Sequence, residues 1–260
     1  MPDQLRAPDL LIASHGRSGS TLLAALLTSP PHRIVLNEPG IPRAVYGTHV
    51  RQQLQAAGLI PEARPAHLFD NPPQHSDPTE LATELLAPCL SQCQRWGIKE
   101  VNPDWIRASA ATLAPRQILI LVRDLAESAA SLYLKNKREG EPRSADWLIE
   151  RFRTSLEALA ELLESPAVPT RRVWYHQFVA SEAARDELAD WLDWPLDGTP
   201  DRNFDIYNRA HESAAHAGRV SSRSVGRYQP GHDAQLDAFV EQLLAATEPQ
   251  RAITHADRPD

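Results

Sequence analysis

The chain carries the sequence LLIASHGRSGSTLLAALL at residues 10–27. Its first residues, Leu10–Ala13, form a short apolar run that is typical of a buried strand. The following segment, Ser20–Thr28, has leucines at helical spacing, so a glycine-containing turn joins a strand to a helix. Backbone N–H groups converge at such a turn, and the helix N-terminus adds partial positive charge. The stretch therefore predicts an anion-binding loop between its two halves.

The side chains of this loop suit a phosphate or sulfate ligand. Ser20 and Thr21 place hydroxyl donors in the first helical turn, and Arg17 can donate two parallel hydrogen bonds to anion oxygens. The loop is not a Walker A motif, because Ser20 stands where that motif has its lysine. A serine- and glycine-containing turn that only caps the helix is the alternative that the local sequence leaves open.

Further apolar runs alternate with segments of helical spacing along the chain. This alternation predicts βαβ units and hence an α/β fold, a three-layer sandwich with a central, mainly parallel sheet, in one domain over residues 1–260. Segments 61–78 and 195–229 are expected to be long loops or lids. The expected strands are Leu10–Ala13, Arg33–Asn37, Gly97–Val101, Gln117–Val122 and Arg172–Tyr175, and the expected helices are Ser20–Thr28, Asp104–Ala114, Leu125–Lys135 and Ala145–Glu164.

A second basic position follows the strand expected at Gln117–Val122. Arg123 lies at the carboxyl end of that strand, where ligands collect in open parallel sheets. Ser131 lies eight residues further on, on the next expected helix. Its hydroxyl reaches the same anion only if that helix leans back over the strand end. The alternative is an arginine that pairs with Asp124 or Glu127.

Together these motifs resemble those of the sulfotransferases that take their sulfuryl group from 3′-phosphoadenosine 5′-phosphosulfate (PAPS). Residues 17–23 match the family's 5′-phosphosulfate loop, R-S-G-[ST]-T-L-L, position by position. Arg123 and Ser131 match its 3′-phosphate motif, R-[DN]-x₆-S, although Leu125 stands where a proline is frequent. The resemblance implies the P-loop-like fold of that family.

Two later segments also resemble the family. Residues 172–178 are similar to a segment whose tyrosine lies near adenine, which assigns this role to Tyr175, although two residues after it depart from the usual acids. Residues 222–228 are similar to the segment that closes over the 3′-phosphate. The donor-binding residues that the resemblance implies are Arg17, Ser18, Gly19, Ser20, Thr21, Leu22, Arg123, Ser131, Tyr175, Arg223, Ser224, Val225 and Gly226.

The implied reaction moves a sulfuryl group from PAPS to a hydroxyl of a small-molecule or carbohydrate acceptor, releases 3′-phosphoadenosine 5′-phosphate (PAP) and needs no metal. Arg17 is the expected cation for the leaving oxygens. Glu38 follows the strand expected at Arg33–Asn37, and Pro39 favours an extended backbone there. The Glu38 carboxylate should therefore face the same edge of the sheet as the loop at 15–20, and it is the expected base. His15 is the competing base. Lys99, which resembles a family lysine, is expected to stabilise the transferring group.

Two other function classes stay open at this stage. One is a P-loop nucleotide kinase, which places a phosphate loop after the first strand but needs a lysine there. The other is a non-catalytic nucleotide-binding protein of the same fold. The formal net charge of −7 argues against nucleic acid as a partner, because binding the phosphate backbone needs a basic face.

The remaining composition is that of an ordinary soluble domain. No apolar run approaches the roughly 18 residues of a membrane span, and Met1–Asp9 lacks the apolar core of a signal peptide. A cytoplasmic protein is therefore expected, without a membrane partner. Cys89 and Cys93 lie four apart on an expected helix, and two thiols are too few for a structural zinc site.

Overall fold

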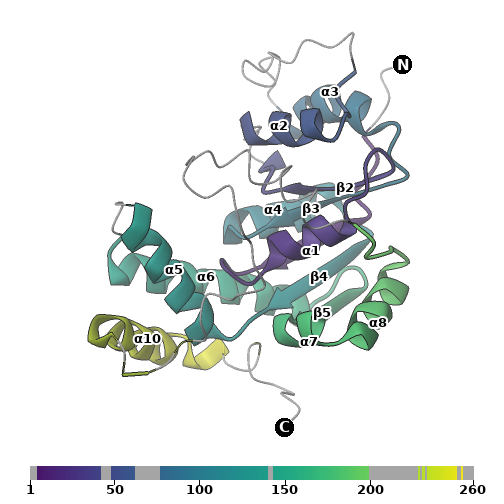
Figure 1. Ribbon diagram of the computed structural model, residues 1–260. Coiled ribbons are helices and arrows are strands. Elements are labelled where there is room, and N and C mark those ends of the chain that lie inside the picture. The colour runs from purple at the N-terminus through teal and green to yellow at the C-terminus, as the bar shows by residue number, and fades with distance from the viewer. Residues whose placement is uncertain are drawn as a thin grey trace.

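The computed structural model describes residues 5–41, 48–61, 77–139, 143–198, 228, 230, 231, 233–250 and 253. Its centre is a five-stranded sheet in the order β2-β3-β1-β4-β5, in which every neighbouring pair is parallel. The strands are β1 (Leu10–Ser14), β2 (Arg33–Asn37), β3 (Arg95–Glu100), β4 (Gln117–Val122) and β5 (Thr170–Trp174). Figure 1 shows this sheet with helices on both of its faces, which confirms the expected α/β sandwich.

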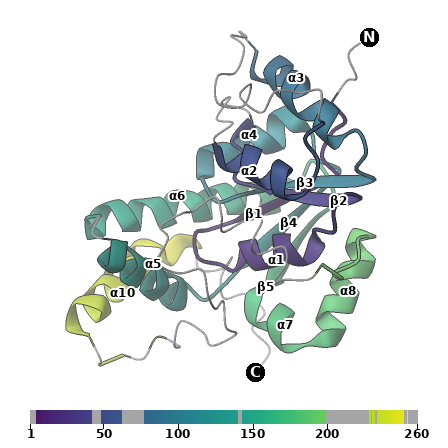
Figure 2. The same cartoon turned by 45° about the horizontal axis from the view of Figure 1, so that its top comes forward.

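Helices connect these strands and build the two outer layers. α1 and α8 lie on one face of the sheet, and α4 and α6 lie on the other (Figures 1 and 2). The indole of Trp194, just after α8, donates a hydrogen bond to the carbonyl of Leu27 at 2.8 Å and so fastens α8 beside α1. The helices are α1 (Ser20–Leu27), α2 (Thr48–Ala56), α3 (Pro78–Leu90), α4 (Pro103–Leu113), α5 (Leu125–Glu139), α6 (Ala145–Glu164), α7 (Tyr175–Ala180), α8 (Glu182–Leu192) and α10 (Ala234–Ala246).

The core is continuous across the middle of the sheet because β1 is buried on both faces. All five residues of β1 are buried, as the central strand of a parallel sheet must be. A second apolar cluster joins α5, α6 and α10 beyond the carboxyl edge of the sheet, with Phe152 and Phe239 among its buried members. This cluster holds α5 in place next to the loop that follows β1.

The expected elements agree with the structure in type and differ at their ends. The last strand is Thr170–Trp174, and not Arg172–Tyr175, because Tyr175 is already the first residue of α7. The short helix α2 was not expected, since Val50 and Leu54 are its only fully buried apolar residues. Both cysteines are buried and free, but they do not share a helix, because α3 ends at Leu90.

The two segments expected to be long loops lie mainly outside the described residues. At the end of the first, Pro78 is not a loop residue but begins α3, where the Asp77 carboxylate accepts a hydrogen bond from the backbone N–H of Thr79 at 2.8 Å. In the part of the chain that the structure describes, no helix has the length and apolar character needed to cross a membrane.

A close approach between β1 and β3 gives a test of this register. A methyl group added at Gly97 in β3 would lie 2.8 Å from the carbonyl oxygen of Leu10 in β1. Gly97→Ala should therefore lower the free energy of unfolding by about 1–3 kcal/mol in urea titrations, because the two strands must move apart. Gly16→Ala is the control, since its methyl group would meet nothing within 4 Å. Equal stabilities of the two variants would contradict the register.

Candidate functional site

The loop between β1 and α1 (residues 15–19, the β1 loop) lies where the connections of the sheet diverge. The connection after β1 leads toward β2 on one side, and the connection after β4 leads to β5 on the other. Parallel strands whose connections separate in this way leave a crevice beyond their carboxyl ends, and α/β proteins bind ligands there. The carboxyl ends of β1 and β4 therefore define the candidate site.

The backbone of this loop has the form of an anion-binding cradle. Arg17 and Gly19 have left-handed φ angles of +66° and +90°, whereas Ser18 between them does not. Residues of alternating hand turn successive N–H groups toward one side. Gly19 is also the N-cap of α1 and has no side chain to bond the first turn; the N–H of Leu22 donates to the Gly19 carbonyl at 3.0 Å, and the N–H groups of Ser20 and Thr21 before it can face an anion.

The hydroxyl of Ser18 supports the same interpretation. Ser18 is fully buried, and its hydroxyl has no hydrogen-bond partner among the described residues. Folded proteins pair nearly all buried hydroxyls, so an unpaired one in a cradle marks a place where a ligand oxygen fits. Ser14 and Ser128, which the sequence interpretation did not select, also have buried, unpaired hydroxyls at the carboxyl ends of β1 and at the start of α5.

The two expected anion positions meet in space. The Nε–H of Arg17 donates a hydrogen bond to the hydroxyl of Ser131 on α5 at 3.0 Å. The guanidinium of Arg123 at the end of β4 donates to the carbonyl of Arg17 at 3.5 Å. Helix α5 therefore leans back over the strand end, as the role expected for Ser131 required. Arg17 and Arg123 are therefore neighbours at the carboxyl edge of the sheet and do not lie on separate faces of the molecule.

An aromatic ring lies beside Arg123 and the loop. The guanidinium carbon of Arg123 lies 4.9 Å from the ring centre of Tyr175 at the start of α7. The same ring packs against Gly19 so closely that a methyl group there would lie 2.2 Å from Tyr175 Cε2. Gly19 is therefore required both for its φ angle and for the room that the ring takes. Glu127 accepts a hydrogen bond from the Nε–H of Arg123 at 3.0 Å, so this contact and the Nη1 contact to Arg17 together leave the remaining N–H groups of that guanidinium for a ligand.

His15 lies beneath the loop and not on its surface. It is fully buried, its Nδ1 lies 3.1 Å from the carbonyl oxygen of Gly16, and its Nε2 accepts a hydrogen bond from the backbone N–H of Arg123 at 3.3 Å. The carbonyl oxygen of Arg123 also lies 3.2 Å from Nε2, so each ring nitrogen has a carbonyl oxygen within reach and the neutral ring can carry its proton on either one. Burial lowers the pKa of the His15 imidazole to about 4, so the ring is uncharged near neutral pH. His15 thus joins the β1 loop to the end of β4.

Glu38 and Lys99 form an ion pair at the same edge of the sheet. The Lys99 ammonium lies 2.5 Å from Glu38 Oε1, and the two side chains are 3% and 35% exposed. A lysine as buried as Lys99 is found in proteins where its charge has a partner. Here the partner is Glu38, whose carboxylate is itself partly exposed to solvent. The pair can therefore reach a ligand in the crevice through the carboxylate.

The backbone of Glu38 differs from the extended form expected before a proline. Its φ is +51°, in the left-handed region. The reason is tertiary: the N–H of Glu38 donates to the Lys99 carbonyl at 2.7 Å, which extends the ladder between β2 and β3 by one residue, and the chain then reverses through Gly40 at φ +59°. Non-glycine residues held in this region cluster at functional sites.

The structure brings most of the sequence-predicted residues together. The loop after β1 and the first turn of α1 contain Arg17–Leu22, and around them lie Arg123, Ser131 and Tyr175. The pair of Glu38 and Lys99 lies at the ends of the neighbouring strands β2 and β3. The remaining expected donor residues, Arg223, Ser224, Val225 and Gly226, lie outside the described residues. Glu100, which follows Lys99 directly, was not selected from the sequence and is fully buried beside this pair.

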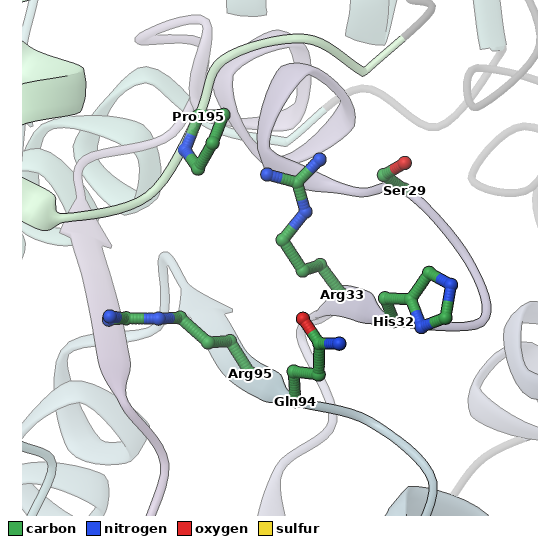
Figure 3. Close-up of a pocket in the computed structure, with 6 residues that line it drawn as sticks. All are labelled: Ser29, His32, Arg33, Gln94, Arg95 and Pro195. Carbon is green, nitrogen blue, oxygen red and sulfur yellow. The ribbon is translucent and has the colours of Figure 1, made fainter.

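A separate depression of about 350 Å³ lies at the opposite, amino edge of the sheet (Figure 3). Arg33 and Arg95, the first residues of β2 and β3, point in different directions there and pair with Asp197 and Asp193. None of the residues selected from the sequence lines it. Its lining residues are Ser29, His32, Arg33, Gln94, Arg95 and Pro195.

No family model and no curated protein matches the sequence, but solved structures match the fold over almost its whole length. The sulfotransferase domain of the Synechococcus PCC 7002 olefin synthase has a TM-score of 0.56 at 17% identity, covering 100% of this chain and 99% of that one. The sulfotransferase domain of the curacin biosynthetic pathway gives 0.55 at 13% identity, with 95% and 99% covered. A sulfotransferase of Mycobacterium avium gives 0.52 at 15% identity, with 95% and 76% covered. The chain therefore has the fold of these sulfotransferases.

The buried His15 predicts how stability depends on pH. Its folded pKa of about 4 lies below the ordinary 6.5, so the unfolded chain binds a proton more readily between these values. The free energy of unfolding is therefore independent of His15 titration above pH 6.5. It falls by up to about 3 kcal/mol as the pH drops from 6.5 toward 4, because the unfolded chain then takes up a proton that the folded protein does not. In urea titrations between pH 7 and pH 4, the wild-type protein should lose correspondingly more stability than His15→Gln. Parallel losses in the two proteins would contradict a buried, neutral His15.

Proposed function

We propose that this protein is a sulfotransferase that moves a sulfuryl group from PAPS to the hydroxyl group of a small-molecule or carbohydrate acceptor. The observation that carries the proposal is that Arg17 and Arg123 are neighbours at the carboxyl edge, where the Arg17 side chain bonds Ser131 and the Arg17 carbonyl accepts from Arg123. A ligand with an anionic group at each end of an adenosine fits such a pair of positions. The sulfotransferase fold of the chain supports the same chemistry.

The β1 loop is the proposed site for the 5′-phosphosulfate. The first-turn N–H groups of α1, the hydroxyls of Ser18, Ser20 and Thr21, and the Arg17 guanidinium supply donors, and Gly19 and Leu22 complete the loop. The unpaired buried hydroxyl of Ser18 fits a phosphate oxygen. These donors have fixed positions before the ligand arrives, which is the arrangement that stabilises developing charge at low cost.

The other end of the crevice is the proposed site for the 3′-phosphate and the adenine. Arg123 and Ser131 would hold the 3′-phosphate, and Tyr175, whose ring contacts both Gly19 and Arg123, is the proposed neighbour of adenine. Arg223, Ser224, Val225 and Gly226 are proposed to close over this end, as their resemblance to the family motif implies. PAP then leaves the crevice as the product.

Glu38 is the proposed base, in preference to His15. Both ring nitrogens of His15 face the backbone of Gly16 and Arg123 and the ring is fully buried, whereas Glu38 is partly exposed at the carboxyl edge. PAPS supplies an activated sulfuryl group. Glu38 takes the proton of the acceptor hydroxyl as that oxygen bonds to sulfur, and Arg17 stabilises the charge that collects on the departing phosphate oxygen. As Glu38 becomes protonated, the charge of Lys99 is released from the pair and can stabilise the transferring group.

A nucleotide kinase and a non-catalytic binding protein are the competing proposals. The kinase needs a lysine in the loop, and Ser20 occupies that position at the buried start of α1. Magnesium-dependent ATP turnover without PAPS turnover would favour it. A binding protein would bind PAP in the crevice without turning over PAPS in any acceptor mixture. Formation of PAP and of a sulfated acceptor, observed by mass spectrometry, distinguishes the three.

Removing the proposed base while keeping its shape tests the assignment of Glu38. Glu38→Gln should reduce kcat at least about 100-fold, the usual contribution of a general base, while donor affinity changes little. Glu161→Gln is the control, since Glu161 is an acid on α6 that pairs with Arg107 away from the crevice. More than a tenth of the wild-type kcat in Glu38→Gln would remove Glu38 as the base.

Calorimetry with two nucleotides tests the 3′-phosphate position. Arg123→Ala should weaken PAP binding about 10- to 100-fold, because a charge-assisted hydrogen bond contributes about 1.5–3 kcal/mol. Binding of an analogue without the 3′-phosphate should change much less. Arg107→Ala serves as the control for loss of an arginine elsewhere. Equal losses for both nucleotides would show that Arg123 does not contact the 3′-phosphate.

A further inference from the structure

Glu100, the last residue of β3, is a buried acid next to the proposed catalytic pair. Its side chain is fully buried, and it follows Lys99 directly along the strand. Glu100 Oε1 accepts a hydrogen bond from the backbone N–H of Gly40 at 3.0 Å, and Oε2 is buried without a partner among the described residues. Burial of a half-satisfied carboxyl group is unfavourable, so packing alone does not account for an acid at this position.

The contact of Glu100 completes the fastening of the segment 38–40. Lys99 holds this turn at two points, through its carbonyl to the Glu38 N–H at 2.7 Å and through its ammonium to the Glu38 carboxylate at 2.5 Å. Glu100 holds it at the third point, Gly40. Glu38 has a left-handed φ angle of +51°, which is strained for a residue with a side chain and persists only where several contacts fix it, whereas Gly40 adopts its φ of +59° without strain.

We propose that Glu100 is a positioning residue for Glu38: its carboxyl group holds the Gly40 N–H and thereby keeps the Glu38 carboxylate against Lys99 at the carboxyl edge of the sheet. The inference rests on the proposed function only in giving Glu38 the role of the base. The contact itself and its effect on the turn do not depend on the reaction. A catalytic group moved by about 1 Å can lose about 100-fold in rate, so a residue that fixes the turn governs turnover without touching substrate.

The charge state of Glu100 matters to this role. Burial, with the Glu38 carboxylate as a further cause, raises the pKa of Glu100 to about 8, against the opposing effects of the Gly40 N–H and the Lys99 ammonium. Glu100 is therefore mainly protonated and uncharged near pH 7, so it adds no negative charge beside the ion pair of Lys99 and Glu38. Above pH 8 it acquires a buried negative charge, which repels the Glu38 carboxylate. Activity that depends on the pair should fall as this charge forms.

Three variants separate positioning from a general effect on folding. Glu100→Ala removes the acceptor for Gly40 and should lower kcat at least about tenfold while the KM for PAPS stays within about threefold. Glu100→Gln keeps an acceptor oxygen and should restore most of the kcat. Thr28→Val is the matched control, because it removes a buried hydroxyl that accepts a hydrogen bond from the N–H of Val35 in β2 at 3.1 Å and donates one to the Ala24 carbonyl at 2.8 Å, outside the segment 38–40.

The pH profile adds a readout that a purely structural residue would not change. The kcat of the wild-type protein should decline with a midpoint near pH 8, and the decline should be absent in Glu100→Gln, which cannot ionise. Wild-type kcat in Glu100→Ala, or the same decline near pH 8 in Glu100→Gln, would overturn the proposal.

Amide hydrogen exchange of Gly40, followed by NMR, tests the contact without any turnover. The Gly40 N–H should exchange slowly in the wild-type protein and in Glu100→Gln, and at least about tenfold faster in Glu100→Ala, with Thr28→Val unchanged. Equal exchange in all four proteins refutes the positioning role even if the protein is a sulfotransferase. Loss of protection in Glu100→Ala supports the role even if PAPS is not the donor.

Discussion

The buried ring of His15 joins two parts of the chain that lie far apart in the sequence. One of its nitrogens contacts the loop after β1 and the other contacts the backbone at the end of β4. The same two parts meet a second time, where Arg17 bonds Ser131 on α5. These contacts fix the distance between the two proposed phosphate positions, so the spacing of the donor site is a property of the folded core. The apolar cluster of α5, α6 and α10 packs against this arrangement: the ring centres of Phe152 and His15 are 5.8 Å apart.

Charge in the site is local and mostly neutralised in pairs. The chain as a whole has a net charge of −7, yet Arg17, Arg123 and Lys99 converge at one edge of the sheet. Arg123 is paired with Glu127 and Lys99 with Glu38, so cations are held next to acids that a ligand can partly displace or protonate. In the proposed reaction, transfer of a proton to Glu38 is linked to release of positive charge toward the sulfuryl group. Because each cation is held by an acid, the positions of Glu38 and Glu127 determine where the charges of Lys99 and Arg123 lie.

Sequence patterns reveal those features of the site that follow from the order of strands and helices. Parallel strands end at the same edge, so the positions of Arg17, Glu38, Lys99 and Arg123 after or at the ends of apolar runs were enough to place them together. Features that depend on contacts between distant residues could not be found this way. Burial of His15, the left-handed backbone of Glu38 and the bond from Gly40 to Glu100 arise from neighbours that the local sequence does not show. Helix α2 was missed because its sequence is mostly polar and only two of its side chains, Val50 and Leu54, enter the core fully.

A crystal structure of the protein with bound PAP tests most directly whether one nucleotide spans both anion positions. The 5′-phosphate should lie on the backbone N–H groups of the loop at 17–21, and the 3′-phosphate should contact Arg123 and Ser131, with adenine beside Tyr175. A nucleotide bound in the reverse orientation, or at the amino edge between Arg33 and Arg95, would contradict the proposed donor site.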